Sequence, residues 1–138
     1  MIAGRRSKTV AFVAILALLT FGALATASAQ PADIKAIDKA FQDHYARGNY
    51  SAAQTEAQQL ERMVKARVGA DHPDYAVALN KLAIVYWRQG KYSEAEGLHK
   101  RALAIREKAL GASHPDVGQT LTNLARVCLL YTSPSPRD

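Results

Sequence analysis

The feature that most constrains the fold of this chain is a 42-residue internal repeat. The stretch RGNYSAAQTEA from Arg47 returns as QGKYSEAEGLH from Gln89, and GADHPD from Gly69 returns as GASHPD from Gly111. Glycine recurs at an even spacing, half the length of the repeat, at Gly48, Gly69, Gly90 and Gly111. A glycine after a periodic run is a common helix stop, because it adopts the left-handed conformation without a Cβ clash. The spacing therefore predicts two helices, each of about four to five turns, in every unit.

Apolar and small residues recur at helical spacing within the best-formed unit. They are Leu79, Leu82, Ala83 and Tyr86 in the first helix, and Tyr92, Ala95, His99, Ala102 and Ile105 in the second. Offsets of three and four place each set on one face of its helix. Ala83 and Ala95 are small where two backbones should approach closely, and Tyr86 is large where a gap must be filled. Helical hairpins with two apolar faces must stack to bury them.

The helix starts are repeated as well. Asp71 and Ser113 each precede a proline by two residues and an aspartate by three. Both are residue types that cap helices, and proline suits the first helical position. We therefore predict Asp71 and Ser113 as N-caps.

Together these residues resemble the tetratricopeptide repeat in its 42-residue form, the variant typified by kinesin light chains. The resemblance rests on Leu79, Leu82, Ala83, Tyr86, Gly90, Tyr92, Ala95, Ala102 and the linker His72, Pro73 and Asp74. It covers about residues 32–127 and implies an all-α, right-handed solenoid of antiparallel helical hairpins. The expected elements are hairpins over about 32–68 and 73–110 and an unpaired helix over 115–127, so that the solenoid stops after a half repeat.

The first unit departs from the pattern. Phe41 and His44 stand where the second unit has Ala83 and Tyr86, and Leu60 stands where it has Ala102. A looser first repeat is typical of the end of a repeat array.

The N-terminal segment, residues 1–29, is typical of a secretory signal. Arg5, Arg6 and Lys8 precede an apolar run over 10–25, and Ala27, Ser28 and Ala29 follow it. This order predicts export with cleavage after Ala29. The alternative is an uncleaved membrane anchor, but the run is shorter than the roughly 20 residues that a span needs. We therefore expect a mature protein that begins at Gln30, is periplasmic or secreted, and does not associate with a membrane.

The C-terminal segment CLLYTSPSPRD, which begins at Cys128, breaks the repeat. A tyrosine is due at 128 and 134 and a glycine at 132, where the chain has Cys128, Pro134 and Thr132. At the DNA level this segment resembles, over its whole length, the adapter of transposase-based sequencing libraries. A natural proline-rich linker is the alternative. We therefore expect residues 128–138 to be non-native and the native gene to continue with further repeats.

Charge and motifs argue against several functional classes. The chain has 18 Lys and Arg against 12 Asp and Glu, and 15 against 12 once the signal is removed. This excess is too small and too dispersed to favour nucleic acid. The sequence also contains no glycine-rich phosphate loop, paired cysteines or serine nucleophile motif.

Two histidines are candidates for metal ligands or bases. His72 and His114 each precede an aspartate, Asp74 or Asp116, by two residues. The repeat places the two pairs at equivalent corners of successive hairpins, too far apart to share an ion. The His-Pro-Asp string also occurs in J-domain co-chaperones, but there only once and beside a basic helix that this chain lacks. We therefore predict no enzyme activity, no metal and no cofactor.

The predicted partner is a protein or peptide. In stacked hairpins the first helix of each unit lines the concave face. The residues of that helix that avoid the packing seam are Asn80, Ile84, Trp87 and Arg88, which we predict as a candidate peptide-binding stripe. Asparagine pairs with a peptide backbone, arginine holds a carboxylate, and tryptophan offers an apolar platform. Similar positions commonly contact ligands in tetratricopeptide domains. The alternative is that Trp87 only packs against the next hairpin.

Two functions fit these observations. In the first, the chain is a protein- or peptide-binding scaffold of an exported bacterial tetratricopeptide repeat protein. In the second, it is the N-terminal adaptor region of a longer enzyme such as a caspase-like peptidase, because similar repeats can precede such domains in bacteria.

The signal makes one direct prediction. Protein expressed in an exporting host should begin at Gln30, which N-terminal sequencing or intact-mass measurement would establish. Recovery of an intact Met1 terminus from purified membranes would contradict cleavage and favour the anchor.

Overall fold

The computed structural model describes residues 33–132, which form five helices. These are α1 (Ile34–Ala46), α2 (Tyr50–Val68), α3 (Pro73–Arg88), α4 (Tyr92–Leu110) and α5 (Pro115–Thr132). No strand is present within this range, so the predicted all-α fold is confirmed. The signal over 1–29 and the last part of the tail, 133–138, lie outside the described residues. Within 33–132, no helix has the length and apolar character needed to cross a membrane.

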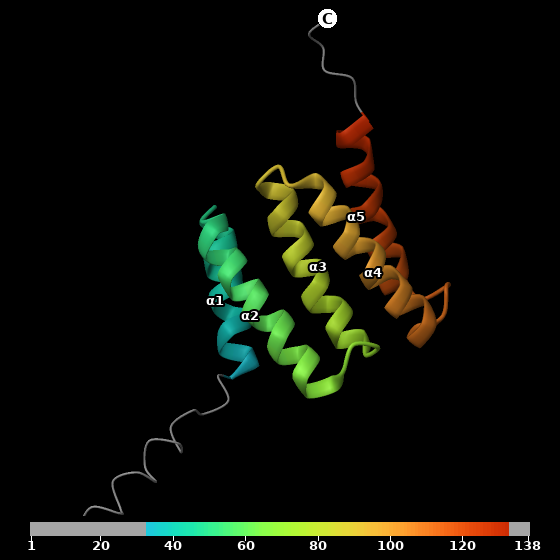
Figure 1. Ribbon diagram of the computed structural model, residues 1–138, viewed down its shortest axis with the longest axis horizontal. Coiled ribbons are helices and arrows are strands. Elements are labelled where there is room, and N and C mark those ends of the chain that lie inside the picture. Colours follow the sequence, from blue (N-terminus) through green and yellow to red (C-terminus); the bar gives the residue numbers. More distant parts are fainter. Residues whose placement is uncertain (1–32, 133–138) are drawn as a thin grey trace, which may run out of the picture. The chain divides into compact units, whose positions relative to one another are not determined.

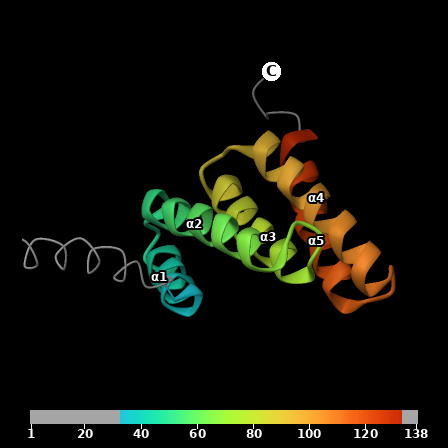
Figure 2. The same ribbon diagram turned by 60° about the horizontal axis from the view of Figure 1, so that its bottom comes forward.

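The helices form successive antiparallel hairpins that stack on one another. Helix α1 packs on α2 and α3 packs on α4, while α2 also packs on α3 and joins the two hairpins (Figure 1). Helix α5 packs on α4 and touches α3 (Figure 2). This arrangement is that of a tetratricopeptide-like helical solenoid, as the repeat predicts.

The four periodic glycines mark the turns between the helices. All have positive φ, between 73° and 90°. Gly69 and Gly111 end the long helices α2 and α4, and their N–H groups donate to the carbonyls of Lys65 and Glu107. A residue with a Cβ would be strained in this conformation, so the prediction that these glycines end helices is confirmed.

The predicted helix caps are wrong by one residue. His72, not Asp71, caps α3, and its Nδ1 accepts from the Asp74 N–H at 3.2 Å. The same contact is made before α5 by His114, rather than Ser113, to the Asp116 N–H. Proline at the first helical position has no N–H, so the first donor in reach is that of the following residue. An imidazole nitrogen replaces the oxygen of a usual cap there.

The predicted apolar faces form the core. Residues buried in α3 include Leu79, Leu82 and Ala83, and those in α4 include Ala95, His99, Ala102 and Ile105. Tyr86 and Tyr92 are half-buried and pack beside them. In the first repeat, the divergent Phe41 and Leu60 are buried too, in one cluster with Leu82 of α3.

Helix α5 keeps an uncovered apolar face. Leu121 is 46% exposed, whereas Leu79, its counterpart in the preceding repeat, is 1% exposed. Ala125 is exposed and Leu124 is half-buried on the same helix. The expected helix over 115–127 continues to Thr132, five residues further.

Candidate functional site

Helices α1, α3, α4 and α5 surround a cavity of about 180 Å³, which we call the inner groove. It is lined by Tyr45, Ile84, Trp87, Arg88, His99, Asn123, Arg126 and Val127. The structure thus brings together three of the four stripe residues predicted from the sequence: Ile84, Trp87 and Arg88. It adds side chains from the neighbouring helices α1, α4 and α5.

Arg88 is held in place by two aromatic rings. Its Nε donates to the Tyr45 hydroxyl at 2.9 Å. Its guanidinium carbon lies 4.9 Å from the centre of the Trp87 ring and 5.7 Å from that of Tyr45. These contacts tie α3 to α1 while the Arg88 side chain stays exposed to solvent. The guanidinium is therefore positioned before any ligand arrives.

Trp87 is half-buried between the groove and the next hairpin. It packs in a cluster with Ala83 and Ala95 and with Val127 of α5. Its indole Nε1 is buried and has no hydrogen-bond partner among the described residues. Trp87 therefore packs against the next hairpin, as the alternative expects, and also lines the groove.

The sequence predicts that Asn80 contacts a ligand, but the structure places its side chain in the core. It is 7% exposed. Its Oδ1 lies 2.8 Å from His99 Nδ1, and its Nδ2 donates to Thr120 Oγ1 at 3.3 Å. Both edges of the amide already have partners, so Asn80 is not available to pair with a peptide backbone. We expect its replacement to lower stability rather than binding alone.

Asn80 belongs to a buried polar network that joins three helices. Arg106 donates from Nη1 to Thr120 Oγ1 at 2.7 Å and to the Asp116 carbonyl at 2.8 Å. Thr120 also donates to the Asp116 carbonyl. His99, Asn80 and Thr120 thus connect α4, α3 and α5 directly behind the inner groove. These hydrogen bonds favour one packing arrangement of the three helices, although Arg106 Nε is buried without a partner among the described residues.

Burial also changes the acid–base behaviour of His99. It lowers the pKa of His99 from its ordinary 6.5 to about 4. Since Asn80 donates its amide N–H to Thr120, its Oδ1 faces the histidine, and His99 Nδ1 is the donor in that contact. The ring is therefore neutral at physiological pH.

The middle of the chain matches the model of a known protein family. The tetratricopeptide repeat model matches residues 76–116, which run from α3 through α4 to the start of α5. The match supports a tetratricopeptide repeat protein. No curated protein matches the chain. The kinesin-light-chain type stays a prediction.

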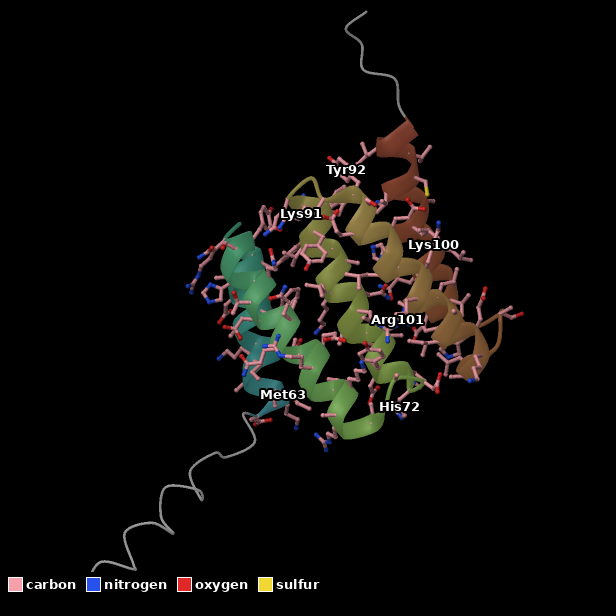
Figure 3. All side chains as sticks on the ribbon, in the orientation of Figure 1. Met63, His72, Lys91, Tyr92, Lys100 and Arg101 are labelled. Carbon is pink, nitrogen blue, oxygen red and sulfur yellow. The ribbon has the colours of Figure 1, made fainter. Side chains whose placement is uncertain are left out.

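The His-Asp pairs before α3 and α5 have a structural role, because His72 and His114 cap these helices. Figure 3 shows His72 at the turn between α2 and α3, at the opposite edge from Lys91 and Tyr92. No group of three or more potential metal-binding side chains lies together within 33–132. Tetratricopeptide repeats are in general non-catalytic scaffolds, and the absence of enzyme activity in this chain stays a prediction.

Five residues that line the groove lie outside the predicted stripe: Tyr45, His99, Asn123, Arg126 and Val127. Tyr45 is the counterpart of Trp87 in the first repeat, and Arg126 is the counterpart of Ile84 in the third. Asn123 is likewise the counterpart of Lys81. Shifting the predicted stripe by one repeat in both directions would have found Tyr45 and Arg126.

We expect stability to fall in acid because of His99. The unfolded chain binds a proton below about pH 6.5, whereas the folded chain keeps His99 neutral down to about pH 4. The stabilisation is therefore complete above pH 6.5 and is lost as the pH falls from 6.5 to 4. The full shift is worth about 3 kcal/mol, and solvent screening reduces it toward about 1 kcal/mol.

Chemical unfolding at several pH values measures this effect. The variant His99→Gln should lose most of the pH dependence between 6.5 and 4, while the control His44→Gln, on the partly exposed His44 of α1, should retain it. Equal acid sensitivity in the chain and in His99→Gln would contradict the role of His99.

Proposed function

We propose that this chain is a scaffold that binds a peptide segment of another protein in the inner groove. Tetratricopeptide repeats generally mediate protein–protein interactions, and the family match supports that general role. The observation that carries the proposal is the convergence of Ile84, Trp87 and Arg88 with Arg126 on one groove.

The chemistry of the groove favours a peptide that carries a carboxylate beside an apolar side chain. Arg88 on α3 and Arg126 on α5 place two guanidinium groups around the cavity. Arginine binds carboxylates through paired N–H groups, and the rings around Arg88 reduce the entropy lost when it does so. Ile84 and Trp87 offer the apolar contact between them.

The proposed setting is outside the cytoplasm. The order of charges, apolar run and small residues over 1–29 supports export to the periplasm or beyond, with cleavage after Ala29. The scaffold would then meet its partner in that compartment.

The adaptor role in a longer enzyme uses the same groove. As the N-terminal region of a caspase-like peptidase, the repeats would bring a partner or substrate to a catalytic domain elsewhere in the protein. Peptide binding alone does not separate this role from that of a free scaffold, whereas the uninterrupted gene sequence does.

Replacement of Arg126 gives the sharpest binding test. It is exposed on α5, and none of the hydrogen bonds or ion pairs within 33–132 involves it, so its loss should leave the fold intact. A peptide array that combines acidic and apolar residues supplies the probe. Arg126→Gln should weaken binding of the best peptide by about 1 to 3 kcal/mol, as measured by fluorescence anisotropy.

The matched control is Arg62→Gln, on the exposed Arg62 of α2, which lines neither this groove nor the larger cavity described below. It should bind like the unchanged chain. Absence of any binding peptide, or equal losses in Arg126→Gln and Arg62→Gln, would reject the inner groove as the site.

Resequencing the gene tests the proposed origin of the C-terminal segment. If residues 128–138 derive from an adapter, independent reads should diverge directly after the Val127 codon. They should then give an aromatic codon at 128, glycine at 132 and tyrosine at 134. Genomic reads that encode CLLYTSPSPRD would establish the segment as native.

A further inference from the structure

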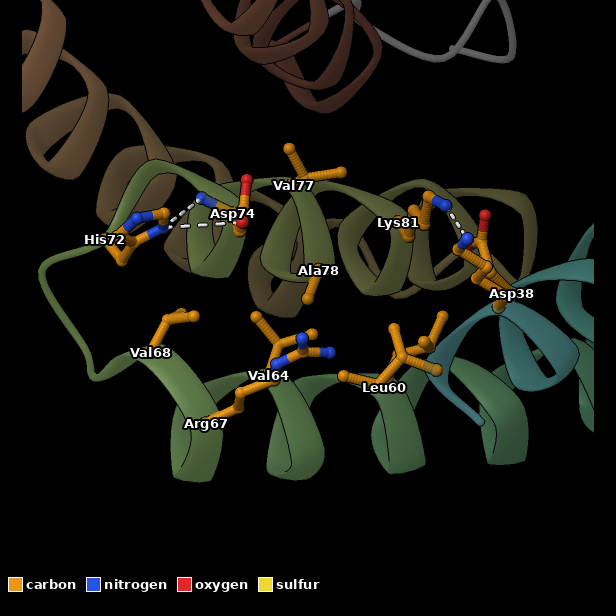
Figure 4. Close-up of a pocket in the computed structure, with 12 residues that line it drawn as sticks. Asp38, Leu60, Val64, Arg67, Val68, His72, Asp74, Val77, Ala78 and Lys81 are labelled. Carbon is orange, nitrogen blue, oxygen red and sulfur yellow. Dashed lines mark hydrogen bonds and ion pairs between the residues drawn. The ribbon is translucent and has the colours of Figure 1, made fainter. Parts of the chain in front are cut away.

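A second, larger cavity of about 490 Å³ lies between α1, α2 and α3, and we call it the lateral pocket. Its apolar lining comes from Ile34, Leu60, Val64, Val68, Val77 and Ala78 (Figure 4). Charged residues stand around it on all three helices. Its size falls within the range of about 300 to 1,000 Å³ that is typical of small-molecule sites, whereas the inner groove lies below that range.

The internal repeat explains why this pocket exists. At the equivalent junction of the next repeat, Arg106 stands in place of Val64 and Thr120 in place of Ala78. There the long Arg106 side chain reaches Thr120 and the Asp116 carbonyl, and the buried polar network occupies the space. At the first junction the corresponding side chains are short and apolar, so the space stays open.

One charged side chain at the rim of the pocket, Arg67, is available to pair with an anionic ligand. Lys81 forms an ion pair with Asp38, and His72 accepts the Asp74 N–H. Arg67 is exposed and has no ion-pair partner among the described residues. Figure 4 shows the Arg67 side chain reaching from α2 toward α3, beside Val64. An anionic group at this position would complete the charge balance.

We propose that the lateral pocket binds a small amphiphile, an apolar chain that ends in a carboxylate. The chain would lie against the accessible side chains of Ile34, Val68 and Val77, and the carboxylate would pair with Arg67. The buried Leu60, Val64 and Ala78 form the floor beneath them. A peptide fits these walls less well, because its backbone amides would lose their hydrogen bonds to water against an apolar surface. This site is separate from the inner groove and does not depend on peptide binding there.

Decanoate, below its micelle-forming concentration, is a suitable probe for the purified full-length chain. Isothermal titration calorimetry should show saturable binding of one decanoate per chain. Decanamide, which has the same chain without the charge, should bind about tenfold more weakly, and acetate should not bind measurably. Arg67→Gln should remove the preference for decanoate over decanamide, whereas Arg62→Gln should keep it.

Filling the pocket gives an independent readout. Val64→Phe and Ala78→Leu should each weaken decanoate binding about tenfold or more, with circular dichroism used to verify that the helices are retained. Methyl NMR of the unchanged chain covers the case in which both variants unfold. Decanoate should shift the signals of Val64, Val68 and Ile34 and leave those of Ile84 and Val127 in place.

Several outcomes would overturn the proposal. The first is the absence of saturable decanoate binding. The second is decanoate binding that stays unchanged in Arg67→Gln and in both filling variants. The third is a set of methyl shifts centred on the inner groove. Displacement of decanoate by the acidic peptide of the inner groove, in an Arg67-dependent manner, would assign the pocket to a peptide instead. Decanoate binding that appears only in a self-associated form would assign it to contacts between copies of the chain.

Discussion

The whole arrangement depends on the close approach of helices at alanine. Several alanines on α2, α3 and α4 have no exposed surface, among them Ala53, Ala57, Ala83, Ala95 and Ala102. A methyl side chain lets two backbones come together and leaves room for larger neighbours such as Phe41 and Leu82. Larger residues at these positions would force the helices apart, at a cost of about 1 to 3 kcal/mol for each overpacked site. The turns, the groove and the lateral pocket all rest on this spacing.

The fold was predictable because its signals are local and repeated. Evenly spaced glycines mark the turns, and the apolar offsets mark the buried faces, so each element is defined within its own repeat. The site was less predictable because it depends on contacts between repeats. Asn80 looks like an exposed polar residue on a helix, and its burial follows only from His99 and Thr120, which lie on two other helices. The predicted caps, Asp71 and Ser113, were wrong for a similar reason. The sequence shows which residue types can cap a helix, but not that a histidine nitrogen is the atom that reaches the N–H.

Equivalent positions of the repeat have different physical roles at the first junction, between α1, α2 and α3, and at the second, between α3, α4 and α5. Val64 and Ala78 leave an apolar cavity at the first junction, whereas Arg106 and Thr120 fill the second with hydrogen bonds. Ala57 and His99 differ in the same way. An apolar cavity loses the dispersion contacts of its lining. A buried arginine must be paired, and Arg106 is paired through Nη1 but not through Nε, so the two junctions have different energetic costs. A repeat can therefore keep its backbone register while changing what each junction is able to bind.

His99 belongs both to the buried polar network and to the lining of the inner groove. Its ring lines the groove, and its Nδ1 bonds the Asn80 amide, which in turn holds Thr120 of α5. Arg126 lies on that same helix, six residues after Thr120, so the position of one groove wall depends on the buried network. Because the hydrogen bonds of the network join α3, α4 and α5, they hold α5, which carries Arg126, against α3, which carries Arg88. The interior polar residues thus shape the groove that the exposed arginines present.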